Sequence, residues 1–212
     1  MRLIRRRASV APTADMPPHA ARICLLAAAE RRIAEIVARY PGVETGGVLA
    51  GFDDSSLGAI VIVGASGPGA WAQHAPYRFN RDPQHCQRWL DECVTASSGV
   101  LDFVGEWHSH PEPNPEASTV DIRSHVALAA NPACHRTLLV MLIAGSRHAR
   151  RTGSTHYTRS HVWSVRHDGV ARRRLDVLPD SAYRDLLAAV NHGDRVAGGT
   201  SQLPFGPGAA AP

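Results

Sequence analysis

The sequence predicts an α/β fold, a single domain in which a mixed β-sheet is flanked by helices. Helical and strand patterns alternate along the chain, and a hairpin signal stands near its C-terminal end. The 212 residues are 44% hydrophobic, which is enough for one sizeable core. We expect the domain to occupy residues 22–194, between a flexible N-terminal segment at 1–21 and a flexible Gly/Pro/Ala tail at 195–212.

The first third of the chain predicts a strand, a helix and two further strands. Residues 23–26 predict a short strand, and residues 27–40 an amphipathic helix with its apolar residues on one face. A Pro-Gly pair at residues 41–42 ends this helix, because proline does not continue one. Strand-like stretches follow at residues 48–49 and 59–65, separated by a turn rich in Asp and Ser.

The middle of the chain predicts a short strand, a capped helix and a second strand. The short strand is expected at residues 77–80. Asp82 is a typical N-cap residue, and Pro83 fits the first turn of the helix that follows it. Residues 100–107 alternate apolar and polar side chains with the period of a strand.

The last third predicts an apolar strand, a loop, a hairpin and a short helix. Residues 137–144 are fully apolar and strand-like, and residues 146–158 form an Arg/His-rich segment that we expect to be a loop. The dipeptide Asp168-Gly169 is a typical hairpin turn. The strands of this hairpin and the last helix are expected at residues 161–166, 170–177 and 182–191.

A candidate metal site follows the strand predicted at residues 100–107. His108 and His110 stand one residue apart, and alternate side chains of a strand share a face. Their backbones are then about 7 Å apart, and both imidazoles can reach one ion at about 2.0–2.1 Å. Glu106 lies on the same face, which makes it a candidate for the catalytic base or for a residue that orients a ligand.

Further residues complete the parts of a hydrolytic zinc site, which needs three protein ligands, an open position for water and a base. Asp121 lies in the first turn of a helix predicted at residues 119–131 and can point back at the metal. Ser118 and Asp121 also match a capping box, a role compatible with the first. Glu44, upstream, is either the base or a surface residue in a turn, and His125 either approaches the site or is structural.

This pattern resembles the motif of the JAMM (JAB/MPN+) metalloprotease family. That motif is a Glu, then His-Ser/Thr-His-Pro, seven residues to a Ser, and an Asp after two more residues. The chain matches every position and gap between Glu44 and Asp121, and the resemblance extends over roughly residues 23–145. The Gly-Glu-Trp sequence before the histidines resembles the bacterial branch of the family, which is associated with ubiquitin-like conjugation systems. The resemblance implies a JAMM/MPN-like domain.

The resemblance also implies a role for each motif residue. The ligands that it implies for one catalytic Zn²⁺ are His108, His110 and Asp121. Glu44 would accept a proton from the attacking water, and Ser118 would hydrogen-bond the oxyanion of the tetrahedral intermediate. Apart from the resemblance, we expect Glu106 to orient a ligand from behind, and Ser109 is a second candidate for such a role.

The activity implied is that of a deubiquitinase-like zinc isopeptidase or peptidase. It would cleave after the C-terminus of a ubiquitin-like protein, in deconjugation or precursor processing, within a bacterial antiphage conjugation system. Its partners would be that protein, its conjugates and the associated activating and conjugating enzymes. A related alternative is a peptidase that processes a sulfur-carrier protein. An inactive MPN-type scaffold is disfavoured, because such scaffolds lose metal ligands and this chain keeps them.

The basic composition raises an alternative of another class, a nucleic-acid-binding module. The pI is about 9.2, and arginine runs stand at residues 5–7, 150–151 and 172–174. The net charge is only +4 and no recognition motif is present, so this is the weaker hypothesis. All 23 basic residues are arginine and none is lysine. A GC-rich genome explains this, as does avoidance of modification by a lysine-conjugating system.

The remaining composition indicates a cytoplasmic protein that does not enter a membrane. No apolar run approaches the roughly 20 residues that span a bilayer, and no apolar stretch follows the basic N-terminus as in a secretion signal. The cysteines are scattered and lack a C-x-x-C pair, so we expect free, mostly buried thiols. They are Cys24, Cys86, Cys93 and Cys134.

Overall fold

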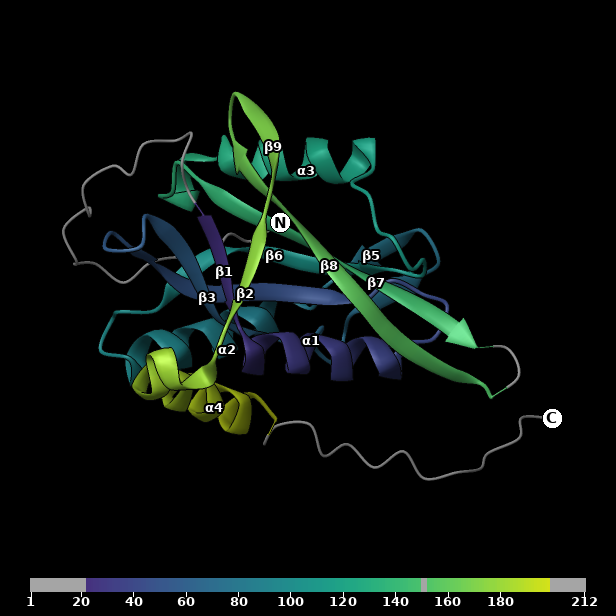
Figure 1. Ribbon diagram of the computed structural model, residues 1–212, viewed down its shortest axis with the longest axis horizontal. Helices are drawn as coiled ribbons and strands as arrows, with labels where there is room; N and C mark the ends of the chain where they lie inside the picture. The colour runs from purple at the N-terminus through teal and green to yellow at the C-terminus, as the bar shows by residue number, and fades with distance from the viewer. Residues whose placement is uncertain (1–21, 150–151, 199–212) are drawn as a thin grey trace.

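An eight-stranded mixed sheet organises the part of the chain that this computed structural model describes, residues 22–149 and 152–198 (Figure 1). The strand order is β10-β1-β3-β2-β6-β7-β8-β9, with parallel pairs at β10-β1, β1-β3 and β6-β7. The strands are β1 (Arg22–Leu26), β2 (Gly46–Asp54), β3 (Ala59–Ala65), β6 (Asp102–His110), β7 (Leu139–Ala149), β8 (Ser154–Arg166), β9 (Gly169–Arg173) and β10 (Leu175–Leu178). The predicted mixed sheet is confirmed.

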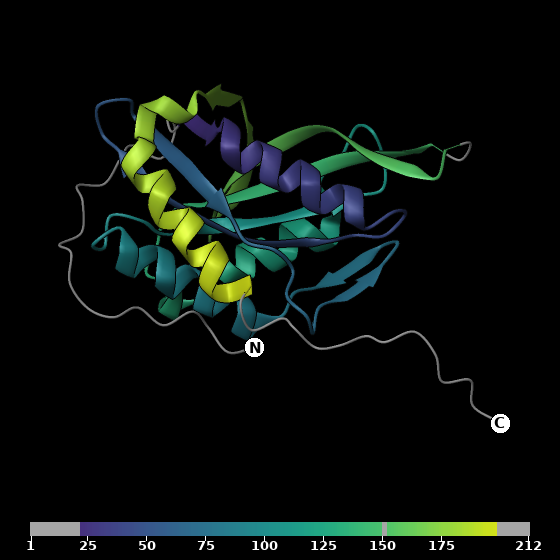
Figure 2. The same cartoon turned by 90° about the horizontal axis from the view of Figure 1, so that it is seen from below.

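Helices cover both faces of this sheet, and each face has its own apolar core. The helices are α1 (Ala27–Arg39), α2 (Pro83–Ala96), α3 (Thr119–Ala129) and α4 (Arg184–Gly198). Ile33, Ile36 and Val37 of α1 pack on one face, as their spacing predicts. Trp89 of α2 and Val190 of α4 share the other core. Figure 2 shows α1 on one side of the sheet and α2 on the other.

The sheet curls, because its two edge strands follow each other in the chain. Only Arg174 separates β9 from β10, yet β9 pairs with β8 at one edge and β10 pairs with β1 at the other. The predicted hairpin across Asp168-Gly169 is confirmed for β8 and β9. The prediction of a single second strand at residues 170–177 is wrong beyond Arg173, where β10 pairs with β1 instead of β8. The strand pattern is continuous over these residues and does not reveal where the pairing changes.

The predicted loop at residues 146–158 is wrong. β7 and β8 continue past the end of β6 as a two-stranded ribbon, in which Ser146 pairs with Tyr157 and Ala149 with Ser154. Strand periodicity is hidden here because polar side chains occupy much of both faces of the ribbon. Residues 150–151, with their two arginines, lie outside the described residues, as do the segments 1–21 and 199–212.

The remaining elements follow the sequence with shifted ends. The strand predicted at residues 77–80 is β5 (Arg78–Asn80), which pairs with β4 (Gln73–Ala75) in a separate hairpin. Asp82 caps α2 as predicted, accepting from the backbone N–H groups of the second and third helical residues. α4 extends to Gly198, so its last turn lies inside the predicted tail. Short 3₁₀ helices occupy Pro132–Cys134 and Asp180–Tyr183.

Two compositional expectations can be compared with the described residues. The four cysteines are free, and three are buried while Cys134 is half-buried. Within residues 22–149 and 152–198, no helix has the length and apolar character that a membrane span requires.

Candidate metal centre

Strand β6 brings the two motif histidines together at the end of a central strand. It runs through the motif to His110, as expected from a strand that leads into the motif, and it lies between β2 and β7. His108 and His110 project from the same face, and their Nε2 atoms are 3.1 Å apart. Both are largely buried, each 8% exposed. The predicted convergence of the two imidazoles is therefore present in the structure.

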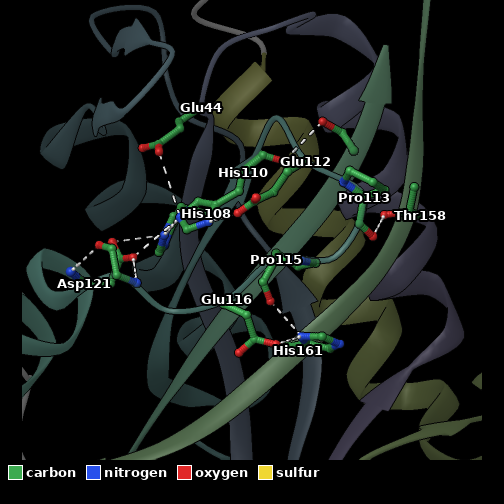
Figure 3. Close-up of polar contacts among 12 residues, drawn as sticks. Glu44, His108, His110, Glu112, Pro113, Pro115, Glu116, Asp121, Thr158 and His161 are labelled. Atoms are coloured by element: carbon green, nitrogen blue, oxygen red, sulfur yellow. Dashed lines mark hydrogen bonds and ion pairs between the residues drawn. The ribbon is translucent and has the colours of Figure 1, made fainter. Parts of the chain in front are cut away.

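Asp121 reaches the same point from the first turn of α3. Its Oδ1 lies 3.2 Å from Nε2 of His108, and its Oδ2 lies 3.5 Å from Nε2 of His110 (Figure 3). The capping box is also present, since the Ser118 hydroxyl accepts from the Asp121 N–H and Oδ2 of Asp121 accepts from the Ser118 N–H at 2.8 Å. The cap holds the carboxylate in the rotamer that faces the histidines.

These three side chains fit a metal ion. Their donor atoms all lie within 4.8 Å of one another. Four ligands placed tetrahedrally at about 2.0–2.1 Å from an ion stand about 3.3–3.4 Å apart. The observed separations of 3.1, 3.2 and 3.5 Å bracket that value. Two imidazoles and one carboxylate are also the donor set of catalytic zinc sites. This group can hold a metal.

The pKa shifts of His108 and Asp121 suit ligation, whereas that of His110 reflects its carboxylate neighbours. Burial lowers the pKa of His108, which favours the neutral imidazole that a metal needs. The pKa of Asp121 lies well below its usual range, because hydrogen bonds from His108 and His110 outweigh the effect of burial. Burial lowers the pKa of His110 as well, but Asp121 and Glu44 together raise it above its ordinary value. Asp121 thus supplies a negative charge that a bound cation would balance in place of a proton on His110.

Glu44 lies beside this group, just before β2. Its Oε1 is 3.9 Å from Nε2 of His110, and its side chain is 13% exposed (Figure 3). Burial raises the pKa of Glu44 to about 7, with a contribution from Asp121 and an opposing one from His110. A carboxyl group with such a pKa can take up and release a proton near neutrality. The turn-surface interpretation of Glu44 is thereby disfavoured.

The backbone around Glu44 is fixed from two sides. Its N–H donates to the carbonyl of Ala75 at 2.9 Å, and its carbonyl lies 2.9 Å from Nδ1 of His74, so the β4–β5 hairpin holds it on one side. On the other side Ser109, which is 1% exposed, exchanges two hydrogen bonds with Thr45. The Thr45 N–H donates to Oγ of Ser109 at 3.1 Å, and the Ser109 N–H donates to the Thr45 carbonyl at 2.7 Å.

The Gly-Gly pair after Glu44 permits this close approach. A Cβ at Gly46 would stand 2.3 Å from the Trp107 carbonyl oxygen, and one at Gly47 would stand 2.5 Å from that of Ser66. Both distances are shorter than any side chain tolerates. Gly46 therefore lets β2 lie against β6 at the level of the histidines, which places Glu44 next to His110, and Gly47 lets β2 pass close to Ser66, just after β3.

The proline-rich segment between β6 and α3 is fastened to the β7–β8 ribbon. The carbonyls of Glu112, Pro113 and Pro115 accept hydrogen bonds from groups of that ribbon (Figure 3). The donors are Ser146 N at 2.9 Å, Thr158 Oγ1 at 2.9 Å and His161 Nδ1 at 2.7 Å. Glu112, which sequence reasoning missed, also places Oε1 3.3 Å from Nδ1 of His110. The sequence feature that could have indicated Glu112 is its position two residues after the candidate ligand His110.

Glu106 and His125 form a separate contact beside the centre. Oε1 of Glu106 pairs with Arg81, and its Oε2 faces Nε2 of His125 at 3.8 Å. His125 is buried, and its ring centroid lies 6.3 Å from that of His108. The side chain of Glu106 thus turns toward Arg81 and His125, whereas Glu44 is the carboxylate next to His110.

Comparison with known proteins identifies the domain. A family model described as prokaryotic homologs of the JAB domain matches residues 26–163. A protein of Escherichia coli named CD-NTase/cGAS isopeptidase is 32% identical over 110 residues, 51% of this chain and 65% of that protein. One of Pseudomonas aeruginosa with the same name is 33% identical over 100 residues, 47% of this chain and 62% of that protein. The match therefore spans less than two thirds of the length of these relatives.

A solved structure agrees on the fold alone. The solution structure of a Desulfitobacterium hafniense protein superposes with a TM-score of 0.53 at 17% identity. The superposition covers 74% of this chain and 93% of the other. At that identity the likeness concerns the arrangement of strands and helices.

Proposed function

This chain belongs to the family of prokaryotic homologs of the JAB domain, and on that premise we propose that it is a zinc-dependent isopeptidase. It would cleave the bond that follows the C-terminus of a ubiquitin-like protein. The observation that carries this proposal is the convergence of His108, His110 and Asp121 with the Glu44 carboxylate beside them. These are the groups that hydrolysis of an amide bond requires, namely a metal-binding set with an adjacent base.

The chemistry divides between the metal and the side chains around it. A Zn²⁺ held by His108, His110 and Asp121 would lower the pKa of water toward about 7 and polarise the scissile carbonyl. Glu44 takes the proton of the attacking water and then gives it to the leaving amine. Its position 3.9 Å from His110 and its pKa of about 7 suit both transfers. The fixed backbone of Glu44 keeps the carboxylate in place between the two steps.

Ser118 is positioned to stabilise charge on the substrate. Its hydroxyl already accepts the N–H of Asp121 at 3.2 Å, which uses a lone pair and leaves the O–H free to donate. The side chain is exposed at the start of α3, next to the ligand Asp121. We assign that donated hydrogen bond to the carbonyl oxygen as it gains negative charge. One such donor contributes about 10²–10³ in rate.

The names of the relatives support a proposal for the class of substrate. Proteins called CD-NTase/cGAS isopeptidase match this chain at 32% and 33% identity. We therefore place this chain in an antiphage conjugation system, where it removes a ubiquitin-like protein from its targets or trims its precursor. The activating and conjugating enzymes of the same system would be its partners. Processing of a sulfur-carrier protein is the related alternative, with the same site residues.

The test uses the full chain and a candidate ubiquitin-like protein fused at its C-terminus to a reporter. Zinc-loaded wild type should cut directly after the last residue of the modifier, as read by mass spectrometry. Glu44→Gln should keep its zinc, lose about 10²–10⁴-fold in rate and retain uncut substrate. The matched control is Glu30→Gln. Glu30 is a half-buried residue of α1 that accepts a hydrogen bond from Tyr157 of β8, and this variant should cut normally.

Two results would contradict the proposal. If zinc-loaded wild type leaves every ubiquitin-like fusion intact, the proposal that its substrate is a ubiquitin-like protein is refuted. Near-normal turnover by Glu44→Gln, with Glu106→Gln inactive, would show that the base is Glu106.

A further inference from the structure

A cluster of three polar side chains, the buried His125 and the half-buried Arg81 and Glu106, lies next to the candidate metal centre and takes no part in the mechanism above. Nη2 of Arg81 pairs with Oε1 of Glu106 at 2.7 Å, and Oε2 of Glu106 lies 3.8 Å from Nε2 of His125. The side chains are 24%, 17% and 7% exposed, respectively. Charged groups withdrawn from water are costly unless they are paired, so this cluster calls for an explanation.

The cluster joins three separate parts of the fold. Arg81 stands between β5 and α2, Glu106 lies in the middle of β6, and His125 lies on α3. Nδ1 of His125 contacts the backbone carbonyl of Asp121 at 2.9 Å. Because a carbonyl only accepts, Nδ1 is the donor. Nε2 then faces Glu106, and it has no direct hydrogen-bond partner among the described residues.

Apolar packing of α3 is confined to one side of the helix. Leu128 is its one buried apolar side chain and Val126 and Ala129 pack half-buried against the core, whereas Val120 and Ile122 are 71% and 36% exposed. The other buried residue of the helix is His125. The helix nevertheless has to present Asp121 within about a few tenths of an ångström of a ligand position, because metal–ligand distances tolerate little variation. The polar contact at His125 is thus a main fixed point of α3 near the metal centre.

We propose that Glu106 is a positioning residue that sets the place of Asp121 through His125. Arg81 forms an ion pair with the Glu106 carboxylate, this carboxylate lies 3.8 Å from Nε2 of the buried His125 ring, and Nδ1 of that ring hydrogen-bonds the Asp121 carbonyl. Glu106 lies on the same strand, β6, as the histidine ligands His108 and His110. Positioning Asp121 through Glu106 therefore fixes it relative to the strand that carries the other two ligands. The inference rests on the proposed function in one respect, that His108, His110 and Asp121 bind a metal.

The geometry separates this role from that of a base. One carboxylate oxygen of Glu106 forms an ion pair with Arg81 and the other lies 3.8 Å from Nε2 of His125, so the carboxylate faces these two groups. The Glu44 carboxylate has its nearest charged neighbour in the ligand His110 itself. Removing the Glu106 charge should therefore alter how the metal is held, without removing the group that moves protons.

The test measures metal binding by the full chain, with no substrate present. The variant Glu106→Gln keeps the shape and loses the charge. The readouts are zinc affinity by competition with a chelator, the visible absorption spectrum of the Co²⁺-substituted protein, and the melting temperature of the metal-free protein. We expect affinity to fall roughly 10–100-fold, the usual effect of losing a group that orients a ligand. The Co²⁺ bands should also change in position or intensity.

The matched control is Asp53→Asn. Asp53 forms a comparable, partly buried pair with Arg136 at 2.8 Å, near the end of β2 opposite to Gly46. At about 3.3 Å per residue it lies about 20 Å or more from the metal centre. Asp53→Asn should lower the melting temperature about as much as Glu106→Gln while leaving zinc affinity and the Co²⁺ spectrum unchanged.

A second variant tests the route through the imidazole. His125→Phe keeps a ring and removes both nitrogens, and it should lower zinc affinity as Glu106→Gln does. The double variant should lose little more than either single one, because both changes break the same connection. Additive losses would overturn the proposal, as would a Glu106→Gln protein with the affinity and spectrum of wild type. Wild type that binds neither Zn²⁺ nor Co²⁺ would instead refute the proposed function.

Discussion

Ser109 should fix the position of the catalytic base although it touches no substrate. Its Oγ accepts the N–H of Thr45, a residue with no exposed surface, at 3.1 Å. Ser109→Ala leaves that N–H buried and unpaired, which costs about 1–3 kcal/mol. For a domain of this size 1 kcal/mol corresponds to about 2–4 °C in melting temperature. We therefore expect a drop of about 2–12 °C in the metal-free protein.

The same substitution should reduce catalysis. The second Ser109–Thr45 hydrogen bond is between backbone atoms and survives, so the segment of Glu44 loosens without detaching. A displacement of about 1 Å at a catalytic group costs up to about 10²-fold in rate. The assay is kcat/KM on the modifier–reporter fusion, together with zinc content, which should stay that of wild type.

Ser97→Ala is the control for this prediction. Oγ of Ser97 accepts the buried N–H of Leu101 at 3.0 Å, in the turn between α2 and β6. This variant loses a hydrogen bond of the same kind, so its melting temperature should fall similarly while kcat/KM is retained. If Ser109→Ala loses no more activity than Ser97→Ala, the reasoning about the position of Glu44 is refuted.

Three further predictions concern the metal, the pH dependence and the substrate. Wild type should carry one zinc per chain by elemental analysis and His108→Ala much less, and equal zinc in both would remove the ligand assignment. Metal-free wild type should lose stability from about pH 4.5 to about pH 7, because the raised pKa of Glu44 means that the folded state binds the extra proton. The melting temperature of Glu44→Gln should fall less than that of wild type over that pH range. The same pH dependence of the melting temperature in both proteins would contradict the raised pKa of Glu44. A free tail peptide should be cut far more slowly than the same tail on its folded modifier, since remote contacts support positioning. Equal kcat/KM for both would indicate a general metallopeptidase.

Much of the secondary structure could be predicted because it depends on neighbours in sequence. The apolar spacing in α1, the Asp82 cap of α2 and the Ser118–Asp121 capping box are local patterns, and all three are present. The ribbon at residues 146–158 and the division between β9 and β10 were mispredicted. The division between β9 and β10 depends on pairing with β1, which lies far away in the sequence. The ribbon depends on pairing between β7 and β8 beyond the end of β6.

The sequence by itself determined the candidate metal-binding group, because its geometry is encoded within fourteen consecutive residues, from His108 to Asp121. Strand period places the two histidines on one face, and a helix cap places the aspartate opposite them. Only the tertiary structure decided what surrounds that group. The pairing of β2 with β6 brings Glu44 to His110, and a contact between Thr45 and Ser109, 64 positions apart, holds it there. Glu106 was expected beside the ligands from its strand face, but Arg81 and His125 direct its carboxylate. A strand pattern specifies the face on which a side chain lies, whereas its partners depend on segments that meet it only when the chain folds.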